Sequence, residues 1–144
     1  MNKDVLFSSN KTTWRTPPEL FQELNDEFHF TLDAAADDNN HLCKNYFTEN
    51  DSGLDHDWRG HTVFVNPPYG RKLTSDWVKK AYEEAQKGTK IVMLIPARTD
   101  TIWFHDYIYG KAEIRFLRGR VHFLDENGNR GDAAPFPSMV VVYN

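Results

Sequence analysis

Short apolar runs alternate with amphipathic stretches along this chain, and the alternation predicts an α/β protein. Apolar residues at three-to-four spacing after Pro17-Pro18 predict a helix over residues 18–27. Further helices are predicted over residues 75–86 and 100–109. The predicted strands are, in chain order, 28–33, 46–48, 62–65, 91–95, 113–117, 120–123 and 139–143. Strands that alternate with helices indicate a mostly parallel sheet, with an antiparallel pairing near the C-terminus.

The length and composition of the chain suit one compact domain. Its 144 residues are 40% hydrophobic and 14% aromatic, which is enough for an ordinary core over residues 1–144. Cys43 is the single cysteine and cannot form a disulfide within the chain, and the residues near Met1 lack the pattern of a signal peptide. The longest apolar run, at residues 91–95, is too short to span a membrane. We therefore expect a cytoplasmic protein without a membrane segment.

Charge is divided unevenly between the two halves of the chain, whose net charge is −4. Residues 1–70 carry 5 Lys or Arg against 12 Asp or Glu, whereas residues 71–144 carry 12 against 9. The second half could therefore face a polyanion such as a nucleic acid. A solvated surface with unevenly spread charge explains the same counts, so charge alone does not decide between the two.

The stretch VFVNPPYG at residues 63–70 places unusual chemistry at the end of a predicted buried strand. Proline has a carbonyl but no N–H, so the Pro67-Pro68 turn is rigid and presents acceptors only. The Asn66 side-chain oxygen adds a further acceptor, and together they could hold both hydrogens of a substrate amino group and make its nitrogen more nucleophilic. Tyr69 would then stack on the ring that carries the amino group. A strand followed by a plain proline turn is the structural alternative.

Asp33 and Asn66 both stand at the ends of predicted strands. In open parallel sheets, ligands bind beyond the carboxyl ends of the strands. The two residues are therefore expected to lie at one edge of the sheet and to belong to one site.

The Asn66-Pro67-Pro68-Tyr69 tetrapeptide resembles the signature of S-adenosylmethionine-dependent methyltransferases that act on planar amide or amino nitrogens. The order of the other motifs is similar to that of the phage-type DNA adenine methyltransferases. These motifs are WRTP at 14–17, FTLDAAA at 30–36, NPPYG at 66–70, LIPARTDT at 94–101, RGR at 118–120 and APFPS at 134–138. The resemblance implies a Rossmann-like methyltransferase fold in a bacterial or phage-infected host cell. It also implies methyl transfer from S-adenosylmethionine to the exocyclic amino group of adenine in DNA, with the target base flipped out of the duplex.

The resemblance further implies which residues bind the cofactor. Thr16 and Pro17 would contact its methionine carboxylate, although a Thr before a helix-starting proline is also an ordinary N-cap. Asp33, followed by Ala34, would receive its methionine ammonium group in a charge-assisted contact. Residues 34–40 contain no glycine, unlike the glycine-rich loop of most methyltransferases, so the form of the cofactor cradle is left open.

The short, acid-rich segment between residues 40 and 66 would hold the adenosine part of the cofactor. Asp57 is expected to bind its adenine amino group, and Glu49 or Asp51 its ribose hydroxyls. Asn66 would contact the cofactor as well as the substrate. For each of the three acids, a solvated turn residue is the alternative.

DNA contacts are expected from the basic half of the chain. Arg98, Arg118 and Arg120 follow late strands and would meet phosphates or a guanine edge. We expect no separate target-recognition domain, so base recognition would come from loops around residues 70–74 and 125–137 or from a second subunit. A homodimer is therefore left open.

Other chemistry has less support in the sequence. Asp55-His56-Asp57 has residues of metal-ligand type, but no second cluster of Cys or His completes a tetrahedral set, so we expect no metal. The expected mechanism is direct in-line transfer without a covalent enzyme intermediate, in which Asn66 and the Pro67 carbonyl orient the amino group. The Asn-Pro-Pro-Tyr motif also allows methylation of a protein glutamine amide or of an RNA base. A non-catalytic nucleic-acid-binding module is a further alternative, but it would not need both Asp33 and the motif.

Overall fold

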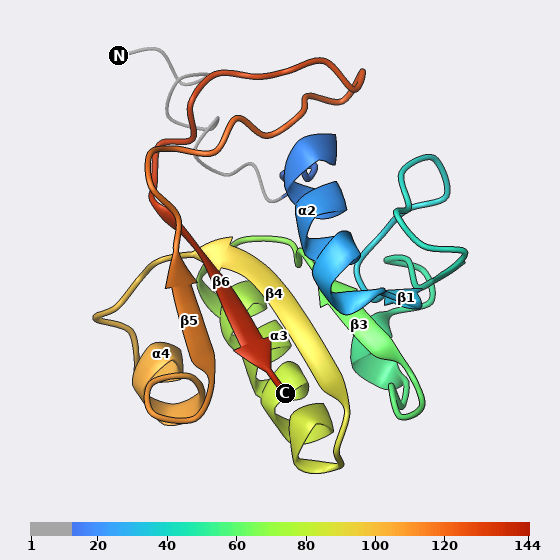
Figure 1. Cartoon of the computed structure of the whole chain (residues 1–144), viewed down its shortest axis with the longest axis vertical. Helices are drawn as coiled ribbons and strands as arrows, with labels where there is room; N and C mark the ends of the chain where they lie inside the picture. Colours follow the sequence, from blue (N-terminus) through green and yellow to red (C-terminus); the bar gives the residue numbers. More distant parts are fainter. Residues whose placement is uncertain (1–12) are drawn as a thin grey trace.

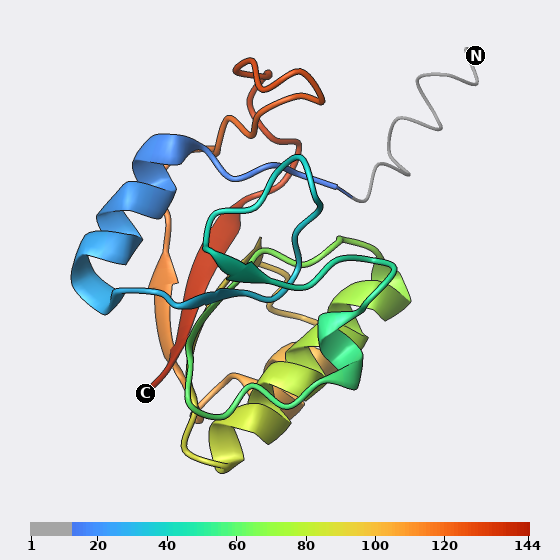
Figure 2. The same cartoon turned by 90° about the vertical axis from the view of Figure 1, so that its right-hand side faces the viewer.

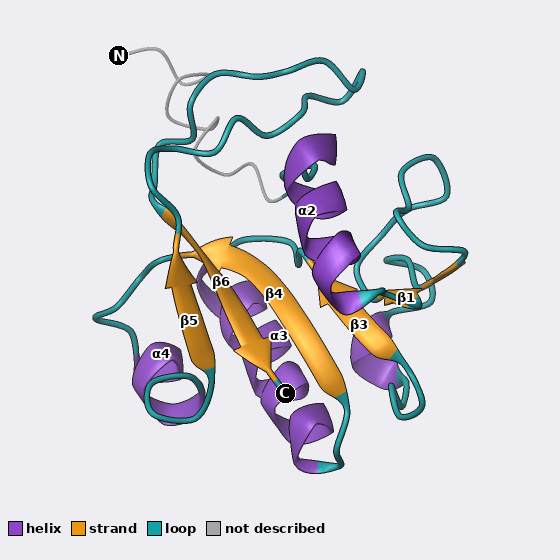
Figure 3. Cartoon of the chain, viewed as in Figure 1, coloured by secondary structure: helices purple, strands orange, loops and turns teal. Residues whose placement is uncertain are grey.

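A sheet with helices on both of its faces makes up the part of the chain that the computed structural model describes, residues 13–144 (Figure 1). The helices are α2 (Pro18–Phe28), α3 (Arg71–Gln86) and α4 (Ile102–Tyr107), with a 3-10 turn, η1 (Gly53–Asp55). The strands are β1 (Leu32–Asp33), β2 (Asn45–Tyr46), β3 (Thr62–Val65), β4 (Lys90–Pro96), β5 (Glu113–Phe116) and β6 (Ser138–Tyr143). Figure 3 shows how these elements alternate along the chain.

The six strands lie in the order β2-β1-β3-β4-β6-β5. Strand β1 is parallel to β2 and β3, and β3 is parallel to β4. Strand β6 runs antiparallel to both of its neighbours, β4 and β5. The α/β class, the mostly parallel sheet and the antiparallel pairing near the C-terminus are thus confirmed.

The centre of the sheet is buried between two layers of helices. Strands β3, β4 and β6 are almost wholly inaccessible to water because α2 covers one face and α3 and α4 cover the other (Figures 1 and 2). Helix α2 buries Phe21 and Leu24, and α3 buries Trp77, Val78 and Ala81. These positions recur at three-to-four spacing, so the apolar stripe that predicted each helix is the face that packs on the sheet.

The predicted strand over residues 28–33 is wrong for most of its length. Helix α2 continues to Phe28, and His29 then ends it in the left-handed conformation (φ 58°), with its N–H bonded to the carbonyl of Asn25 at 2.8 Å. The Asn25 side chain also accepts from the N–H of Phe30, at 2.9 Å. The backbone here closes a helix and cannot join the sheet, so only Leu32 and Asp33 form β1.

The predicted strand over residues 120–123 is also wrong. These residues belong to the long loop between β5 and β6, which projects beyond the carboxyl ends of the parallel strands (Figures 1 and 2). Their backbone bonds to the loop itself, through Val121 to Ala134 and through Phe123 to Gly131, both at 2.9 Å. Phe123 is buried against aromatic rings of the loop and the N-terminal segment, and this packing explains the strand-like alternation in the sequence.

Three other element boundaries differ by a few residues from the prediction. Helix α3 starts at Arg71 instead of residue 75, because Gly70 and Thr74 exchange two hydrogen bonds that close the first turn. Helix α4 starts only after Thr101, whose hydroxyl accepts from the N–H of Phe104 at 3.2 Å. Strand β2 covers Asn45–Tyr46 and stops before residues 47 and 48.

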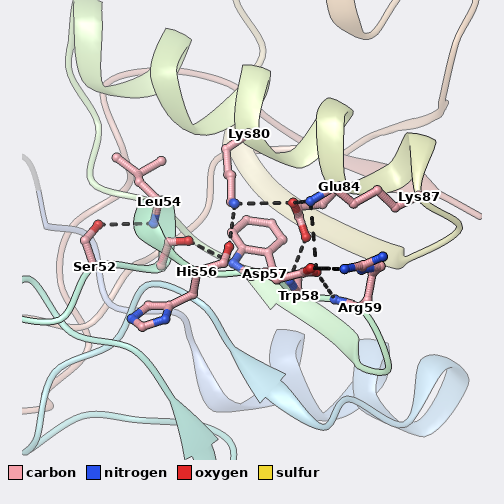
Figure 4. A network of polar contacts seen from close by, with 10 residues as sticks. Ser52, Leu54, His56, Asp57, Trp58, Arg59, Lys80, Glu84 and Lys87 are labelled. Carbon is pink, nitrogen blue, oxygen red and sulfur yellow. Dashed lines mark hydrogen bonds and ion pairs between the residues drawn. The ribbon is translucent and has the colours of Figure 1, made fainter.

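A buried carboxylate fastens residues 52–59 to helix α3 (Figure 4). Glu84 is 1% exposed and accepts from the backbone N–H of Trp58 and from the Lys87 ammonium, both at 2.6 Å, and from Lys80 at 3.3 Å. The indole N–H of Trp58 donates in turn to the carbonyl of Gly53 at 2.9 Å. The segment that contains η1 is therefore held firmly beside the carboxyl end of β1.

None of the helices described between residues 13 and 144 is long and apolar enough to cross a membrane. The residues near Met1 that were assessed for a signal peptide lie outside the described range.

Candidate active site

The path of the chain through the sheet creates a switch point between β1 and β3. From β1 the chain moves outward to β2, then returns to the other side of β1 and continues from β3 to β4. Connections that diverge in this way leave a crevice at the carboxyl ends of the two strands. Asp33 ends β1 and Asn66 directly follows β3, so both residues lie at this crevice as predicted.

A cavity of about 320 Å³ occupies the crevice, and we call it the first cavity. Its volume lies within the range of small-molecule sites, about 300–1,000 Å³. Most of the residues expected to bind a cofactor line it: Thr16, Asp33, Ala34, Glu49 and Asn66. Pro67 and Pro68, which were expected to face the substrate, line it too. Other lining residues include Trp14, Leu42, Ser52, Leu54 and Trp77. Pro17 is the N-cap residue of α2 and is not part of this lining.

Asp33 is a buried carboxyl group at the bottom of this crevice. It is 3% exposed, and one of its oxygens accepts from the backbone N–H of Leu42 at 3.0 Å. Burial raises the pKa of Asp33 to about 6, although backbone hydrogen bonds from Leu42 and Ala35 act in the opposite direction. A cationic ligand group at this point would offset the cost of burying the carboxylate charge.

Gly53 explains how the site manages without a glycine-rich loop after β1. A Cβ atom on Gly53 would come within 2.3 Å of the Ala34 carbonyl oxygen, so only glycine allows η1 to approach the end of β1 this closely. Ser52 and Leu54, on either side, thereby become walls of the first cavity. The close backbone approach comes from a distant segment rather than from residues 34–40.

Three neighbours hold the side-chain amide of Asn66. Its nitrogen donates to the hydroxyl of Thr16 at 2.9 Å and to the carbonyl of Trp14. Its oxygen accepts from the hydroxyl of Tyr69 at 2.7 Å. The amide is therefore oriented with its nitrogen toward the N-terminal segment and its oxygen toward Tyr69.

Tyr69 lies inside an aromatic cluster. Its side chain is 5% exposed and packs against Trp14, Phe123 and Phe136, with ring centroids 5.7–6.4 Å apart. Its hydroxyl is also 2.9 Å from the carbonyl of Leu94. Burial raises the pKa of Tyr69 well above its ordinary value, so the hydroxyl keeps its proton and acts as a donor.

A second cavity, of about 970 Å³, is lined by Tyr69, the hydrogen-bond partner of Asn66, although Asn66 itself is not in its lining. It is lined by residues from both segments expected to read DNA: Gly70, Arg71, Thr74, Asp125, Gly131, Asp132, Ala133, Pro135 and Phe136. The first of these segments was expected to be a loop, but residues 71–74 form the first turn of α3. Arg98 also lines the second cavity. Trp14 borders both cavities, so the N-terminal segment, residues 13–17 before helix α2, forms the partition between them.

Arg15 ties this partition to the long loop. Its guanidinium donates to the carbonyl of Glu126 at 2.7 Å and lies 3.4 Å from that of Asp125. Its own carbonyl accepts from the N–H of Leu124 at 2.9 Å. The loop that borders the second cavity is thus connected directly to the segment that borders the first.

Several predicted site residues lie elsewhere. Asp57 is outside both cavities and pairs with Arg59 at 2.6 Å, which lowers its pKa, so the structure does not bring it to the cofactor crevice (Figure 4). Asp51 bonds to His56 at 2.6 Å and is not in the lining of the first cavity. Arg118 is exposed on the long loop, and Arg120 donates to the carbonyl of Ala134 at 3.1 Å.

Within residues 13–144, no group of three or more His, Cys, Asp or Glu side chains is placed to hold a metal ion. Cys43 is a buried free thiol, and burial raises its pKa to about 12. A thiol in this state is a poor nucleophile.

The main residues that sequence reasoning left without a role are aromatic. Trp14 is the first residue of the WRTP motif, and its membership of that motif was the available signal. Trp77 and Phe123 follow helix-like and strand-like apolar patterns, which predict a core position and do not separate a cavity wall from a core residue.

The α/β fold and the Asn-Pro-Pro-Tyr turn after β3 define an enzyme of the methyltransferase class. Residues 4–144 match the model of the DNA N-6-adenine-methyltransferase (Dam) family. The chain is 30% identical over 148 residues to the DNA N-6-adenine-methyltransferase of Haemophilus phage HP1, a match that covers 99% of this chain and 84% of the relative. It is 35% identical over 106 residues to that of Escherichia phage T1 (72% and 44%), and 40% identical over 63 residues to a putative methyltransferase of Escherichia coli K12 (39% and 69%). The chain therefore belongs to the DNA N-6-adenine-methyltransferase family.

Proposed function

We propose that this chain transfers a methyl group from S-adenosylmethionine to the exocyclic amino group of adenine in DNA. Family membership supports the reaction and its substrate. The observation that carries the site assignment is the position of Asn66: it lines the first cavity and is hydrogen-bonded to Tyr69, which lines the second. A methyl donor in the first cavity and an acceptor base in the second would meet at this residue.

The donor set of the first cavity fits S-adenosylmethionine. Asp33 offers a buried carboxylate for the methionine ammonium group, Glu49 offers acceptors for the ribose hydroxyls, and Leu54 and Trp77 offer apolar surface for the adenine ring. Thr16 also lines the first cavity. The bound cofactor would supply an electrophilic methyl group. The position of Asp57 does not support its assignment to the cofactor, so we omit it from the proposed site.

The target base would leave the duplex and enter the second cavity, because the amino group of a paired adenine cannot reach Asn66. The oxygen of Asn66 and the carbonyl of Pro67 would accept its two amino hydrogens and orient the nitrogen lone pair toward the first cavity. The aromatic wall of Trp14, Tyr69 and Phe136 would contact the base. No strong base is needed in the bond-forming step, since the nitrogen loses a proton after it has become cationic.

Arginines at the second cavity would hold the DNA backbone around the flipped base. Arg98 and Arg71 are exposed and line this cavity. Arg118 and Arg120 lie on the long loop that borders it and remain proposed DNA contacts. We propose that residues 1–144 form a single domain, and sedimentation of the purified chain would show whether it forms a homodimer.

The Asn66→Ala variant tests the assignment. We expect methyl transfer to fall by about 10² or more while cofactor affinity changes only a few-fold, because one preorganised hydrogen-bond partner of the amino group is lost. The measurement is single-turnover transfer of labelled methyl to DNA, with RNA and protein offered separately. Asn45→Ala, at the edge strand β2, is the matched control and should retain full transfer. Label in RNA or in a glutamine amide instead of DNA adenine would refute the proposed substrate.

A further inference from the structure

We infer that the hydroxyl groups of Thr16 and Tyr69 hold the Asn66 amide in the orientation that methyl transfer requires. The two residues would act as positioning residues, through Asn66 and not through contact with the reacting atoms. The inference rests on the proposed function of the site and adds to it a role for two hydroxyls.

The contacts at the amide nitrogen define one half of this arrangement. Thr16 is 6% exposed, and its hydroxyl oxygen accepts from Asn66 at 2.9 Å, beside the carbonyl of Trp14. Both hydrogens of the amide therefore have acceptors on the N-terminal segment. If the amide turned by 180°, its oxygen would face the Trp14 carbonyl, which cannot donate, so that hydrogen bond would be lost; the Thr16 hydroxyl would keep its contact only by donating in place of accepting.

The contact at the amide oxygen defines the other half. The Tyr69 hydroxyl has one hydrogen and two acceptors within reach, the Asn66 oxygen at 2.7 Å and the Leu94 carbonyl at 2.9 Å. Donated along the shorter contact, this hydrogen occupies one of the two lone pairs of the Asn66 oxygen. The second lone pair is left to accept from the adenine amino group. With the amide reversed, an NH₂ group would meet the amino group of the substrate, donor against donor. The correct orientation is therefore a condition for the reaction.

The packing of Tyr69 allows the role of its hydroxyl to be tested separately from that of its ring. The ring is enclosed by Trp14, Phe123 and Phe136, and phenylalanine at this position would keep those contacts. A role restricted to ring stacking predicts no effect of Tyr69→Phe. A positioning role predicts a loss of rate.

The test is a pair of double-mutant cycles with Asn66→Ala. Tyr69→Phe and the isosteric Thr16→Val are each made in the wild-type chain and in the Asn66→Ala background. In the wild-type background we expect each to lower the single-turnover rate about 3- to 10-fold at saturating cofactor and DNA, the value of one hydrogen bond. In the Asn66→Ala background neither should lower it further, because the group that they position is gone.

Matched controls remove a buried hydroxyl elsewhere. Tyr143→Phe loses a hydroxyl that donates to the carbonyl of Tyr107, and Thr89→Val loses one near the start of β4, at the opposite end of the sheet from the site. Both should keep the wild-type rate. Saturating cofactor removes any effect of Thr16 on cofactor affinity, and thermal unfolding reports whether each variant is folded.

An unchanged rate in Tyr69→Phe and Thr16→Val would overturn the inference. Losses of the same size with and without Asn66 would also overturn it, since the hydroxyls would then act independently of the amide. Failure of the proposed function has a different signature, because the wild-type chain itself would transfer no methyl group to DNA adenine.

Discussion

Asp33 shows at the scale of one residue how a buried carboxylate, here one proposed to bind the cofactor, lowers the stability of the cofactor-free protein. Its pKa is raised to about 6 from an ordinary value of 3.8, because burial removes water from the carboxylate. The folded protein therefore binds more protons than the unfolded chain between these pH values. The stability of the cofactor-free protein should fall as pH rises from about 4 to 6, and the full cost, about 3 kcal/mol, applies above that range.

We therefore expect Asp33→Asn to raise the unfolding free energy of the cofactor-free protein at pH 7 and to flatten its pH dependence between 4 and 6. Asn keeps an acceptor for the N–H of Leu42 but carries no charge. The same variant should weaken S-adenosylmethionine binding strongly, because the ammonium group loses its partner. Urea denaturation across this pH range and calorimetry at pH 7 measure the two effects. A variant that is no more stable than wild type at pH 7 would contradict this account of Asp33.

At the scale of elements, the part of the first cavity's wall that Ser52 and Leu54 form depends on the attachment of residues 52–59 to helix α3. Glu84 connects Trp58 to Lys80 and Lys87 (Figure 4). Burial alone would raise the pKa of Glu84, but hydrogen bonds from Lys87, the Trp58 N–H and Lys80 outweigh it and lower the pKa. The contribution of this carboxylate is therefore present above its unfolded-state pKa and is lost as the pH falls below about 4.5.

Replacement of Glu84 tests this attachment. We expect Glu84→Ala to lower the unfolding free energy by about 3 kcal/mol, because the buried Trp58 N–H and the adjacent ammonium groups lose their acceptor. Glu84→Gln should cost less, since it retains one acceptor. The control is Lys72→Ala, which breaks an exposed pair with Asp76 on the same helix and should cost under about 1 kcal/mol. Equal losses of unfolding free energy in Glu84→Ala and Lys72→Ala would show that residues 52–59 are held by other contacts.

At the scale of the whole molecule, both charged halves of the chain contribute charged residues to the proposed ligand sites. The acidic half contributes Asp33 and Glu49 to the first cavity, where the proposed cofactor is cationic. The basic half contributes Arg71 and Arg98 to the second cavity, where DNA would bind. Asp100, Asp125 and Asp132 line the second cavity as well, so the basic excess of the second half of the chain is not concentrated in the lining of that cavity.

The salt dependence of DNA binding tests the proposed phosphate contact of Arg98. We expect Arg98→Ala to weaken DNA binding and to reduce the slope of log affinity against log salt by about 0.9, the value for one lost phosphate contact. Arg59→Ala is the control, because Arg59 is paired with Asp57 away from both cavities and should leave the slope unchanged. Fluorescence anisotropy at several salt concentrations measures both. The same slope in wild type and Arg98→Ala would exclude a phosphate contact at Arg98.

The local sequence by itself determined the elements whose patterns match their final surroundings. Strands β3, β4 and β6 are apolar runs that are buried on both faces, so their pattern and their environment agree. It also determined the position of Asp33 and Asn66 at strand ends, because the carboxyl ends of parallel strands share one edge. The class of chemistry was predicted from the resemblance of one tetrapeptide, and of the order of the other motifs, to a known enzyme family.

The tertiary structure alone decided which partners these residues have. Thr16 and Asn66 are 50 residues apart in the chain, yet they share a hydrogen bond at the wall of the first cavity. Asp57 lies in an acid-rich segment and was therefore expected to bind the cofactor. The hydrogen bond between Trp58 and Glu84 attaches this segment to α3, and the Asp57 carboxylate pairs with Arg59. Periodicity encodes which face of an element is apolar; it does not encode where a loop side chain points, because that depends on packing between segments distant in sequence.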